Sequence, residues 1–503
     1  MDAWVASWAA EPQRKVLHDM RRGWIARGQL LHDSTRIARY LASCGAVAGD
    51  RILCAAKTSY DLVVFHVAAL RMGLVVVPAN TAYQEREVRH LVRDAGVKLA
   101  VVDDAGRADW IRAAAPDTVV IALGPDGSGR LICDAPDSPL GSDELPLDVA
   151  AADDPAVICY TSGTTGVPKG AVLSHRNLIT TATALRTAWR WTEADRLLLC
   201  LPLFHAHGLL VGLHGSLYAG ASAVLLDGFD IDGVLDAAHE HQASMFFGVP
   251  TMYERIAASK RLRELARLRL CVSGSAPLSA QTWRVVAAAS GQRILERYGL
   301  TETLLLASNP VDGERRPGSV GLPLPWVDIR LGSIDHSGVG EIETRGPNVF
   351  IGYWQQPQAT TESFTSDGWF KTGDLGTLDP DGYLTIVGRK KELIISGGYN
   401  VYPQEVESVL RTLPDLDDIA IVGTPSPEWG EVVTAFVVAP SWGESERARL
   451  DDLARRELAP YKRPRLVHVV SAIPRNALGK VLRAELVRAT PSPQPTEAHD
   501  NTQ

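Results

Sequence analysis

Residues 51–79 have the sequence RILCAAKTSYDLVVFHVAALRMGLVVVPA, which decides the fold class. The apolar runs RILCAA and LVVVPA have the length of buried strands, and the amphipathic segment between them has the length of a helix. The chain then repeats the alternation, with the helical pattern YQEREVRHLVRDAG followed by the apolar run LAVVDD. Strands that alternate with helices in this way predict βαβ units and therefore a parallel sheet.

A second series of the same kind extends to about residue 297. Its strand candidates are AVICYTS, RLLLCLPL, SAVLLDG, ASMFFGVP, RLRLCVSGS and RILERYG. Polar or glycine-rich residues follow four of these strands, at positions 161 onward, 202–207, 273–276 and 298–302. Because ligands of open α/β sheets bind at the carboxyl ends of strands, we expect these four ends to form one crevice.

The pattern changes after about residue 316. Residues 316–387 contain short strands separated by Gly and Pro, which is typical of an antiparallel β subdomain, and helix and strand patterns of an α+β domain follow the sequence GRKKELIISGG. We therefore predict an α/β fold in which residues 1–388 form a large N-terminal domain of stacked βα sheets plus a β subdomain. Residues 389–391 form a hinge, residues 392–488 form a small mobile α+β domain, and residues 489–503 form a disordered tail.

Composition and charge limit the class of protein. The 503 residues are 46% hydrophobic and 22% charged, which excludes disordered and fibrous classes, and the net charge of -8 gives no basic field that would attract nucleic acid. The six cysteines are isolated, which favours buried thiols in a reducing compartment over disulfides or a zinc site. The N-terminus lacks a secretory pattern and charged residues interrupt the most apolar stretch, so we predict a cytoplasmic protein without a membrane span or nucleic-acid partner.

Residues 161–170, TSGTTGVPKG, have the composition of a phosphate-binding loop. Glycines allow close approach of the backbone, hydroxyl groups add donors, and Lys169 adds a cation. The spacing differs from that of the Walker A motif, because Pro168 occupies the second glycine position and Gly170 follows the lysine. The loop therefore predicts phosphate binding outside the ordinary P-loop NTPases, with a flexible surface loop as the alternative.

Six motifs follow one another along the chain: YTSGTTGVPKG, ERYGLTE, YWQQP, KTGDLG, GRKKELIISGGYNVYP and PRNALGK. In this order and spacing they resemble the adenylate-forming acyl-CoA synthetase superfamily, and the resemblance covers roughly residues 30–487. It implies an acid–thiol ligase that uses ATP, Mg²⁺ and coenzyme A. In the first half-reaction a carboxylate attacks the α-phosphate of ATP to form an acyl-adenylate and pyrophosphate, and in the second the thiol of coenzyme A displaces AMP.

The resemblance also implies residues that bind the nucleotide and the metal ion. Tyr298 lies against adenine, Thr301 donates to the α-phosphate, and Glu302 with Thr161 binds Mg²⁺, which prefers oxygen ligands. Asp374, assisted by Arg389, accepts hydrogen bonds from the ribose hydroxyls. The alternatives for the two carboxylates are a solvated cap or turn. The remaining nucleotide-binding residues are Thr161, Ser162, Gly163, Thr164, Thr165, Gly166 and Lys169 in the loop, and Gly274, Ser275, Ala276 and Glu296 outside it.

The C-terminal motifs imply a catalytic lysine on a domain that rotates. Lys480 places a positive charge where negative charge develops on the phosphorus, and Lys391 is the hinge. After rotation the loop at residues 396–399 replaces Lys480, and Gly397 and Gly398 allow the pantetheine arm of coenzyme A to pass. The alternatives are a solvated lysine and a plain strand turn.

Five residues are expected to contact the carboxylic acid or control its access. The resemblance places His205 as a catalytic gate between the acid and thiol channels, with His207 as a substrate contact. Arg297, directly before the YGLTE motif, resembles the arginine of malonyl-CoA and methylmalonyl-CoA synthetases, and Arg255 and Ser275 are further substrate contacts. A guanidinium can bind a second, free carboxylate bidentately.

Each of these assignments has a structural alternative. Arg297 could pair with Glu296 or Glu314, Arg255 could face solvent on an amphipathic helix, and either histidine could be satisfied by the backbone at a strand end. The apolar segment at residues 304–308 favours an acid with a larger α-substituent, as in methylmalonate.

We therefore predict an ATP-dependent CoA ligase for a small dicarboxylic acid, malonate or methylmalonate, that acts as a monomer or homodimer. The alternatives are a ligase for fatty or aryl monocarboxylic acids, an adenylation enzyme that loads a carrier protein, and a non-catalytic nucleotide-binding protein. Lys480, Glu302 and Asp374 together argue against the last of these.

Overall fold

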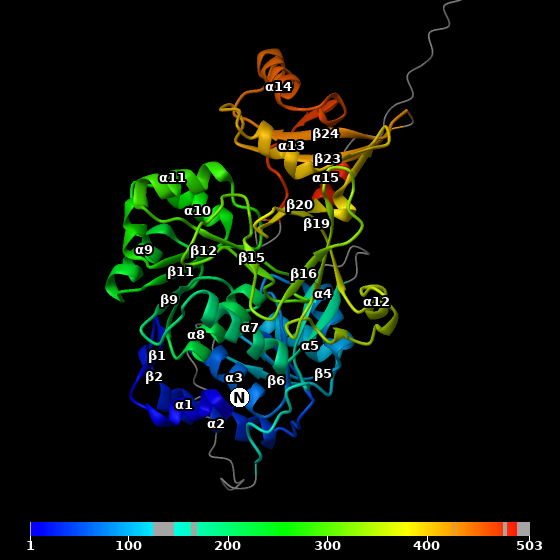
Figure 1. Cartoon of the computed structure of the whole chain (residues 1–503). Helices are drawn as coiled ribbons and strands as arrows, with labels where there is room; N and C mark the ends of the chain where they lie inside the picture. Colours follow the sequence, from blue (N-terminus) through cyan, green and yellow to red (C-terminus); the bar gives the residue numbers. More distant parts are fainter. Residues whose placement is uncertain (1, 124–144, 162–167, 427, 476–479, 490–503) are drawn as a thin grey trace, which may run out of the picture. The chain divides into compact units, whose positions relative to one another are not determined.

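A computed structural model describes residues 2–123, 145–161, 168–426, 428–475 and 480–489 (Figure 1). Contacts divide the chain into two compact units, of which unit 1 comprises residues 1–330, 343–372 and 378–384, and unit 2 comprises residues 331–342, 373–377 and 385–503. The predicted fold class is confirmed: stacked βα sheets and a β subdomain are followed by a smaller α+β domain. The boundary at residue 389 and the hinge at Lys391 stay predictions, and the predicted disordered tail lies outside the described residues except for Ala489.

The three strands of the first predicted series, β3, β4 and β5, lie in a seven-stranded sheet in unit 1. Its order is β18-β8-β7-β4-β3-β5-β6, and the pairs β4/β7, β3/β4, β3/β5 and β5/β6 are parallel. The strands are β3 (Arg51–Ala55), β4 (Val75–Pro78), β5 (Val97–Val102), β6 (Val119–Ala122), β7 (Pro155–Thr161), β8 (Lys169–Ser174) and β18 (Gly352–Tyr353).

The second series, apart from its first candidate AVICYTS, which is β7 of the seven-stranded sheet, lies in a nine-stranded sheet in the same unit. Its order is β15-β14-β13-β12-β11-β9-β10-β1-β2, with parallel pairing from β13 to β1. The strands are β1 (Lys15–Asp19), β2 (Gly23–Ala26), β9 (Arg196–Leu199), β10 (Ser222–Leu225), β11 (Met245–Gly248), β12 (Leu270–Ser273), β13 (Leu295–Tyr298), β14 (Ala307–Ser308) and β15 (Leu322–Pro323).

Helices bury both faces of the two sheets, which explains why the strands are continuous apolar runs. In β3, Leu53 packs with α4 (Glu85–Ala95) and α5 (Ala105–Ala114), whereas Ile52 packs on the opposite face with α2 (Arg27–Ser43) and α3 (Tyr60–Arg71). In β9, Leu198 packs with helices α9, α10 and α11, which lie together beside β11 and β12 in Figure 1. These three helices are α9 (Ile231–Glu240), α10 (Pro250–Ala257) and α11 (Ala280–Ser290). Unit 1 also contains α1 (Asp2–Ala10), α7 (His175–Ala188), α8 (His214–Ala219) and α12 (Pro357–Glu362).

Helix α4 shows how local sequence sets these elements. Its buried residues Val88, Leu91, Val92 and Ala95 recur at helical spacing and cover the sheet. At the start of the helix the carboxylate of Glu87 accepts from the backbone amide of Gln84 at 2.9 Å, and Gly96 ends the helix in the left-handed region at φ 60°. The opposite face is polar, so this helix forms the outer layer.

The predicted β subdomain is a four-stranded sheet with the order β16-β17-β19-β20. Its strands are β16 (Asp328–Leu331), β17 (Gly340–Arg345), β19 (Phe370–Leu378) and β20 (Leu384–Arg389). Two short strands of this region, β15 and β18, instead extend the larger sheets, because their backbones pair with β14 and β8.

The α+β domain in unit 2 is built on a sheet with the order β22-β21-β24-β23, to which β25 is added beside β24. Helices α13 and α14 pack on one face and α15 on the other. Sequence patterns predicted α13, α14, β24 and β25, whereas β23 and α15 were missed. The elements are β21 (Ile394–Ser396), β22 (Tyr399–Val401), α13 (Pro403–Leu410), β23 (Asp418–Ser426), β24 (Gly430–Val438), α14 (Glu444–Glu457), β25 (Leu466–Val469) and α15 (Arg483–Ala489).

The cysteines that the structure describes are unpaired thiols, and four of them are buried, while Cys133 lies outside the described residues. Burial raises the pKa of Cys54, Cys200 and Cys271 to about 12, so these thiols are unreactive core groups.

Within the described part of the chain, no helix is both long enough and apolar enough to cross a bilayer.

Candidate active site

Three of the four predicted strand ends meet beyond β9, β12 and β13. The hydroxyl of Ser275, after β12, lies 3.3 Å from Nδ1 of His207, after β9. Gly274 packs directly on the guanidinium of Arg297 in β13, and Arg297 in turn lowers the pKa of His207 after burial does so. The structure therefore brings His207, Ser275 and Arg297 together.

Arg297 is a buried cation without a partner in the described part of the chain. Its side chain is only 7% exposed, and Nε and Nη2 lack hydrogen-bond partners among the described residues. Burial lowers the pKa of Arg297 to about 9, so the guanidinium remains mostly charged near neutral pH. Glu314 pairs with Arg316, and Oε1 of Glu296 accepts from the amide of Gly318, so neither provides the alternative partner considered from the sequence.

The backbone after β12 has to be glycine at residue 274 to admit this arginine. A Cβ on Gly274 would lie 2.3 Å from Cζ and 2.4 Å from Nε of Arg297. The next residue, Ser275, takes the left-handed conformation at φ 73°, which is uncommon for a residue with a side chain. Strain of this kind is often found at functional sites.

Both candidate histidines are neutral near pH 7. His207 begins a π-helical segment, His207–Leu213, and its ring lies 6.3 Å from that of Phe247 in a stacked geometry. Burial, then Arg297 and His205, hold the pKa of His207 well below 6.5, and its Nε2 has no hydrogen-bond partner in the described residues. Burial lowers the pKa of His205 to about 4. These rings can therefore offer neutral hydrogen-bonding groups beside Arg297 but no positive charge of their own.

The fourth strand end lies on the seven-stranded sheet and contains the phosphate loop. Of that loop the structure describes Thr161, whose hydroxyl donates to the carbonyl of Lys169 at 3.4 Å, and Lys169 itself. Ser162, Gly163, Thr164, Thr165 and Gly166 lie outside the described residues. Nζ of Lys169 lies 5.2 Å from the ring centre of Tyr353. The hydroxyl of Tyr353 donates to Oε1 of Glu302 at 2.9 Å, which connects this end to the nine-stranded sheet.

A tight turn after β13 carries Tyr298, Thr301 and Glu302. Gly299 is required there, because a Cβ would lie 1.8 Å from the carbonyl oxygen of Leu304. The amide of Leu306 donates to the carbonyl of Tyr298 at 2.9 Å and closes the turn. Glu302 is 9% exposed, and it raises the pKa of Cys159 in β7 after burial does so, which places its carboxylate near the start of the phosphate loop.

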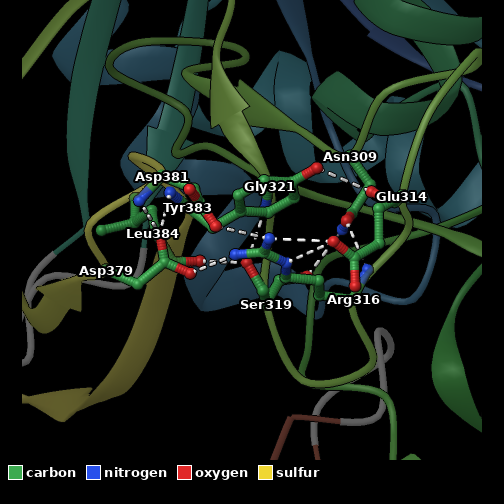
Figure 2. Close-up of polar contacts among 9 residues, drawn as sticks. All are labelled: Asn309, Glu314, Arg316, Ser319, Gly321, Asp379, Asp381, Tyr383 and Leu384. Carbon is green, nitrogen blue, oxygen red and sulfur yellow. Dashed lines mark hydrogen bonds and ion pairs between the residues drawn. The ribbon is translucent and has the colours of Figure 1, made fainter.

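Figure 2 shows a polar network between residues 309–321 and residues 379–384. Asn309 connects this network to Glu296 in β13. The side-chain amide of Asn309 donates to the carbonyls of Glu296 and Ser319, and its oxygen accepts from the amide of Arg316 at 3.0 Å. The guanidinium of Arg316 forms ion pairs with three carboxylates and lies 4.0 Å from the ring centre of Tyr383. Those carboxylates belong to Glu314, Asp379 and Asp381. Burial raises the pKa of Glu296 to about 7, against hydrogen bonds from the amides of Gly318 and Leu278.

Unit 2 holds a second group of predicted residues. Nε of Arg389 lies 3.0 Å from Oδ1 of Asp374, which is 5% exposed at its side chain. The pKa of Lys480 is lowered by burial and then by Arg389, with Asp374 acting in the opposite direction, so the three side chains lie close together. The ribose and α-phosphate residues expected from this domain are therefore neighbours.

The loop after β21 has the predicted glycine conformation. Gly397 and Gly398 have φ of 58° and 81°, and the ring of Trp429 lies where a Cβ on Gly397 would be. Lys391 is exposed in the short 3-10 turn Lys390–Glu392 between β20 and β21. Their predicted roles as the pantetheine-binding glycines and the hinge remain predictions.

Comparisons with known proteins match this arrangement. The model of the AMP-binding enzyme family matches residues 4–354, and that of the AMP-binding enzyme C-terminal domain matches residues 405–480. The malonate–CoA ligase of Arabidopsis thaliana is 35% identical over 482 residues, which cover 88% of this chain and 79% of that protein. A feruloyl-CoA synthase of Amycolatopsis is 33% identical over 505 residues, covering 96% of this chain and 98% of that protein. The ATP-bound MatB protein of Rhodopseudomonas palustris superimposes with a TM-score of 0.90 at 38% identity, covering 97% of this chain and 98% of that one.

The chain belongs to the AMP-binding enzyme family. Within this family it is an AMP-forming acid–thiol ligase, an ATP-dependent acyl-CoA ligase that uses ATP, Mg²⁺ and CoA. The two relatives act on acids of different kinds according to their names, so the family alone leaves the acid open.

For this AMP-binding enzyme, the structure adds information about two residues, Arg255 and Tyr353. Arg255 in α10 is exposed, and its guanidinium lies 5.0 Å from the ring centre of Phe229, which favours the alternative of a solvent-facing residue. Tyr353 was not singled out within the YWQQP motif, although its side chain contacts both Lys169 and Glu302. The motif was the available signal, but nothing in local spacing indicated which of its residues reaches the site.

Proposed function

We propose that this acyl-CoA ligase activates a small dicarboxylic acid, malonate or methylmalonate. The observation that carries the proposal is the buried guanidinium of Arg297, whose Nε and Nη2 have no hydrogen-bond partner in the described residues. A second carboxylate can accept both N–H groups and neutralise the charge, whereas a monocarboxylic acid leaves the cation buried and unpaired.

In the proposed mechanism the nucleotide residues act on the α-phosphate and the leaving group. An oxygen of the acid attacks the α-phosphorus and the bond to the β-phosphate breaks, which gives the acyl-adenylate and pyrophosphate. Thr301 donates to an α-phosphate oxygen, and Lys480 offsets the negative charge that develops there. Asp374 accepts hydrogen bonds from the ribose hydroxyls, and its pairing with Arg389 fixes the orientation of the carboxylate. The thiol of CoA then forms a bond to the acyl carbon and AMP leaves.

The residues present fit a magnesium ion bound together with ATP. Glu302 supplies a carboxylate and Thr161 a hydroxyl, and both are oxygen donors of the type that Mg²⁺ prefers. The described residues contain no group of three or more His, Cys, Asp or Glu side chains that could hold a metal alone. This agrees with an ion held mainly by substrate phosphates and one carboxylate. When bound, the ion neutralises charge on the phosphates.

At the proposed acid-binding site, Arg297 would bind the free carboxylate, and His207 and Ser275 would complete its surroundings. Because His207 is neutral, it can donate to or accept from the acid without adding a charge. Breaking a buried ion pair costs about 3–5 kcal/mol, which corresponds to a roughly 150- to 5,000-fold preference for diacids over monocarboxylic acids.

A pyrophosphate-release assay tests the proposal with malonate, methylmalonate, succinate, acetate, octanoate and benzoate. We expect malonate or methylmalonate to give the highest kcat/KM, and we expect Arg297→Ala to remove that preference. Mass spectrometry of the product with CoA present separates a CoA ligase from an enzyme that loads a carrier protein. A wild-type preference for octanoate or benzoate would refute the diacid assignment and support the monocarboxylic acid alternative.

A further inference from the structure

Tyr353 occupies a position between two groups that the proposed mechanism uses separately. Its hydroxyl donates to Oε1 of Glu302 at 2.9 Å, and Nζ of Lys169 lies 5.2 Å from the centre of its ring. One side chain therefore contacts both the proposed metal ligand and the cation at the end of the phosphate loop. Lys169 begins β8 of the seven-stranded sheet, and Glu302 lies in the turn after β13 of the nine-stranded sheet, so this contact joins the ends of the two sheets at the site.

The backbone fixes the place of Tyr353 from both sides. Strand β18 pairs antiparallel with β8, with Tyr353 opposite Ala171, and the amide of Trp354 donates to the carbonyl of Gly170 at 2.7 Å. On the other side, the amide of Phe350 donates to the carbonyl of Glu302 at 2.7 Å. The backbone on either side of Tyr353 is thus bonded directly to the residue after Lys169 and to Glu302 itself.

The ring of Tyr353 is also held in one orientation. Phe350 contacts it edge-on with ring centres 4.9 Å apart, and the amide of Tyr353 donates to the hydroxyl of Thr360 at 2.9 Å. A tyrosine phenol ordinarily has a pKa of about 10, so this hydroxyl can donate to the carboxylate at neutral pH. A neutral donor on Oε1 restrains the carboxylate without cancelling the negative charge that a cation requires.

We propose that Tyr353 is a positioning residue for magnesium and ATP in this enzyme. Its hydroxyl orients the carboxylate of Glu302 toward the ion, and its ring face holds the ammonium of Lys169 beside the phosphates by a cation–π contact. The proposal rests on the roles proposed above for Glu302 and Lys169. The new element is that the single side chain of Tyr353 aligns both Glu302 and Lys169. A change at Tyr353 should therefore affect metal binding and ATP binding together.

The variant Tyr353→Phe tests the hydroxyl, because it keeps the ring and the Lys169 contact. Tyr160→Phe is a matched control, since the hydroxyl of Tyr160 on β7 donates to Oδ2 of Asp94 at 2.5 Å. Both changes remove one hydrogen bond between a half-buried tyrosine and a carboxylate in the same sheet region. Pyrophosphate release is measured against Mg²⁺ concentration at fixed ATP and acid. Binding of Mn²⁺ with ATP is measured separately by the electron paramagnetic resonance signal of free Mn²⁺.

For Tyr353→Phe we expect the half-saturating Mg²⁺ concentration to rise roughly tenfold and Mn²⁺·ATP binding to weaken by a similar factor. The KM for the acid and the rate of thioester formation from a supplied acyl-adenylate should stay at wild-type values. Tyr160→Phe should leave the metal dependence unchanged. Tyr353→Leu, which also removes the ring face, should weaken ATP binding further than Tyr353→Phe.

Two results would overturn the proposal: wild-type metal dependence in Tyr353→Phe, or the same shift in Tyr160→Phe, which would indicate a general structural effect. The binding measurement also separates this proposal from the proposed substrate. If the wild type releases no pyrophosphate with any dicarboxylic acid, the diacid assignment fails. The comparison of Mn²⁺·ATP binding among the same variants still decides the role of Tyr353.

Discussion

Replacing Arg297 with methionine should raise the stability of the free protein while it removes activity with diacids. Burial lowers the pKa of Arg297 from 12.5 to about 9, and a fall of about 3.5 corresponds to roughly 5 kcal/mol of cost for keeping the guanidinium charged in the protein. Methionine has a similar length and no charge. Since replacement of buried charges by apolar side chains often stabilises proteins by about 1–4 kcal/mol, we expect the free energy of unfolding to rise by an amount in this range.

The same change should lower kcat/KM for malonate or methylmalonate roughly 150- to 5,000-fold, because about 3–5 kcal/mol of ion pairing with the second carboxylate is lost. Activity with acetate or octanoate should stay constant or increase, since these acids have no partner for the guanidinium. Denaturant unfolding without ligand measures the stability change, and pyrophosphate release measures the activity change. Malonate should stabilise the wild type in a thermal melt but not the variant.

The test is specific because stability is expected to rise while activity with diacids is expected to fall. An arginine with a purely structural role would lose stability when it is replaced, and activity with all acids would fall together. A less stable Arg297→Met protein with an unchanged ratio of malonate to octanoate activity would refute the reasoning. Lys260→Met is a control, because Lys260 is exposed and lies outside the pocket, so both measurements should remain at wild-type values.

Four further predictions concern other parts of the site. Gly274→Ala places a methyl group 2.3 Å from Cζ of Arg297 and should displace that side chain. The preference for diacids over monocarboxylic acids should fall at least tenfold with little loss of stability. An unchanged ratio of activities with the two kinds of acid would contradict this. Lys480→Ala should abolish adenylate formation and spare thioester formation from a supplied acyl-adenylate, whereas equal loss of both half-reactions would refute its role. Lys391→Pro restricts one backbone dihedral and should separate the two half-reactions, and an unchanged overall rate would argue against a hinge. The pKa of Glu296 is raised from 4.5 to about 7, so its contribution to stability is present below about pH 4.5 and lost as the pH rises through 7. Between pH 5 and pH 8 the free energy of unfolding of Glu296→Gln should therefore rise by up to about 3 kcal/mol relative to that of the wild type, as measured by denaturant unfolding. A difference that stays constant with pH would contradict the assignment.

Much of the fold followed from local pattern. The apolar runs that became β3, β4 and β5 are buried on both faces, so their continuous hydrophobicity indicated a parallel sheet before any tertiary contact was known. The buried stripe of α4 was likewise visible within a dozen residues. By contrast, β23 contains Gly423 and Pro425, and its nine residues form a strand because they pair along the whole of β24. Pairing of this kind is not visible in local sequence.

Some features of the candidate site are likewise visible in the local sequence, whereas others depend on tertiary contacts. The motifs in the sequence indicated the family, and through that resemblance the two half-reactions, because motif residues at fixed spacing are local features. The residues assigned to the site remain predictions. Only the tertiary structure decided that Arg297 is buried without a described partner, that Arg255 is exposed, and that Tyr353 reaches Glu302 from 51 positions away. Burial, desolvation and partnership depend on which distant segments pack together, and no periodicity of three or four residues contains that information.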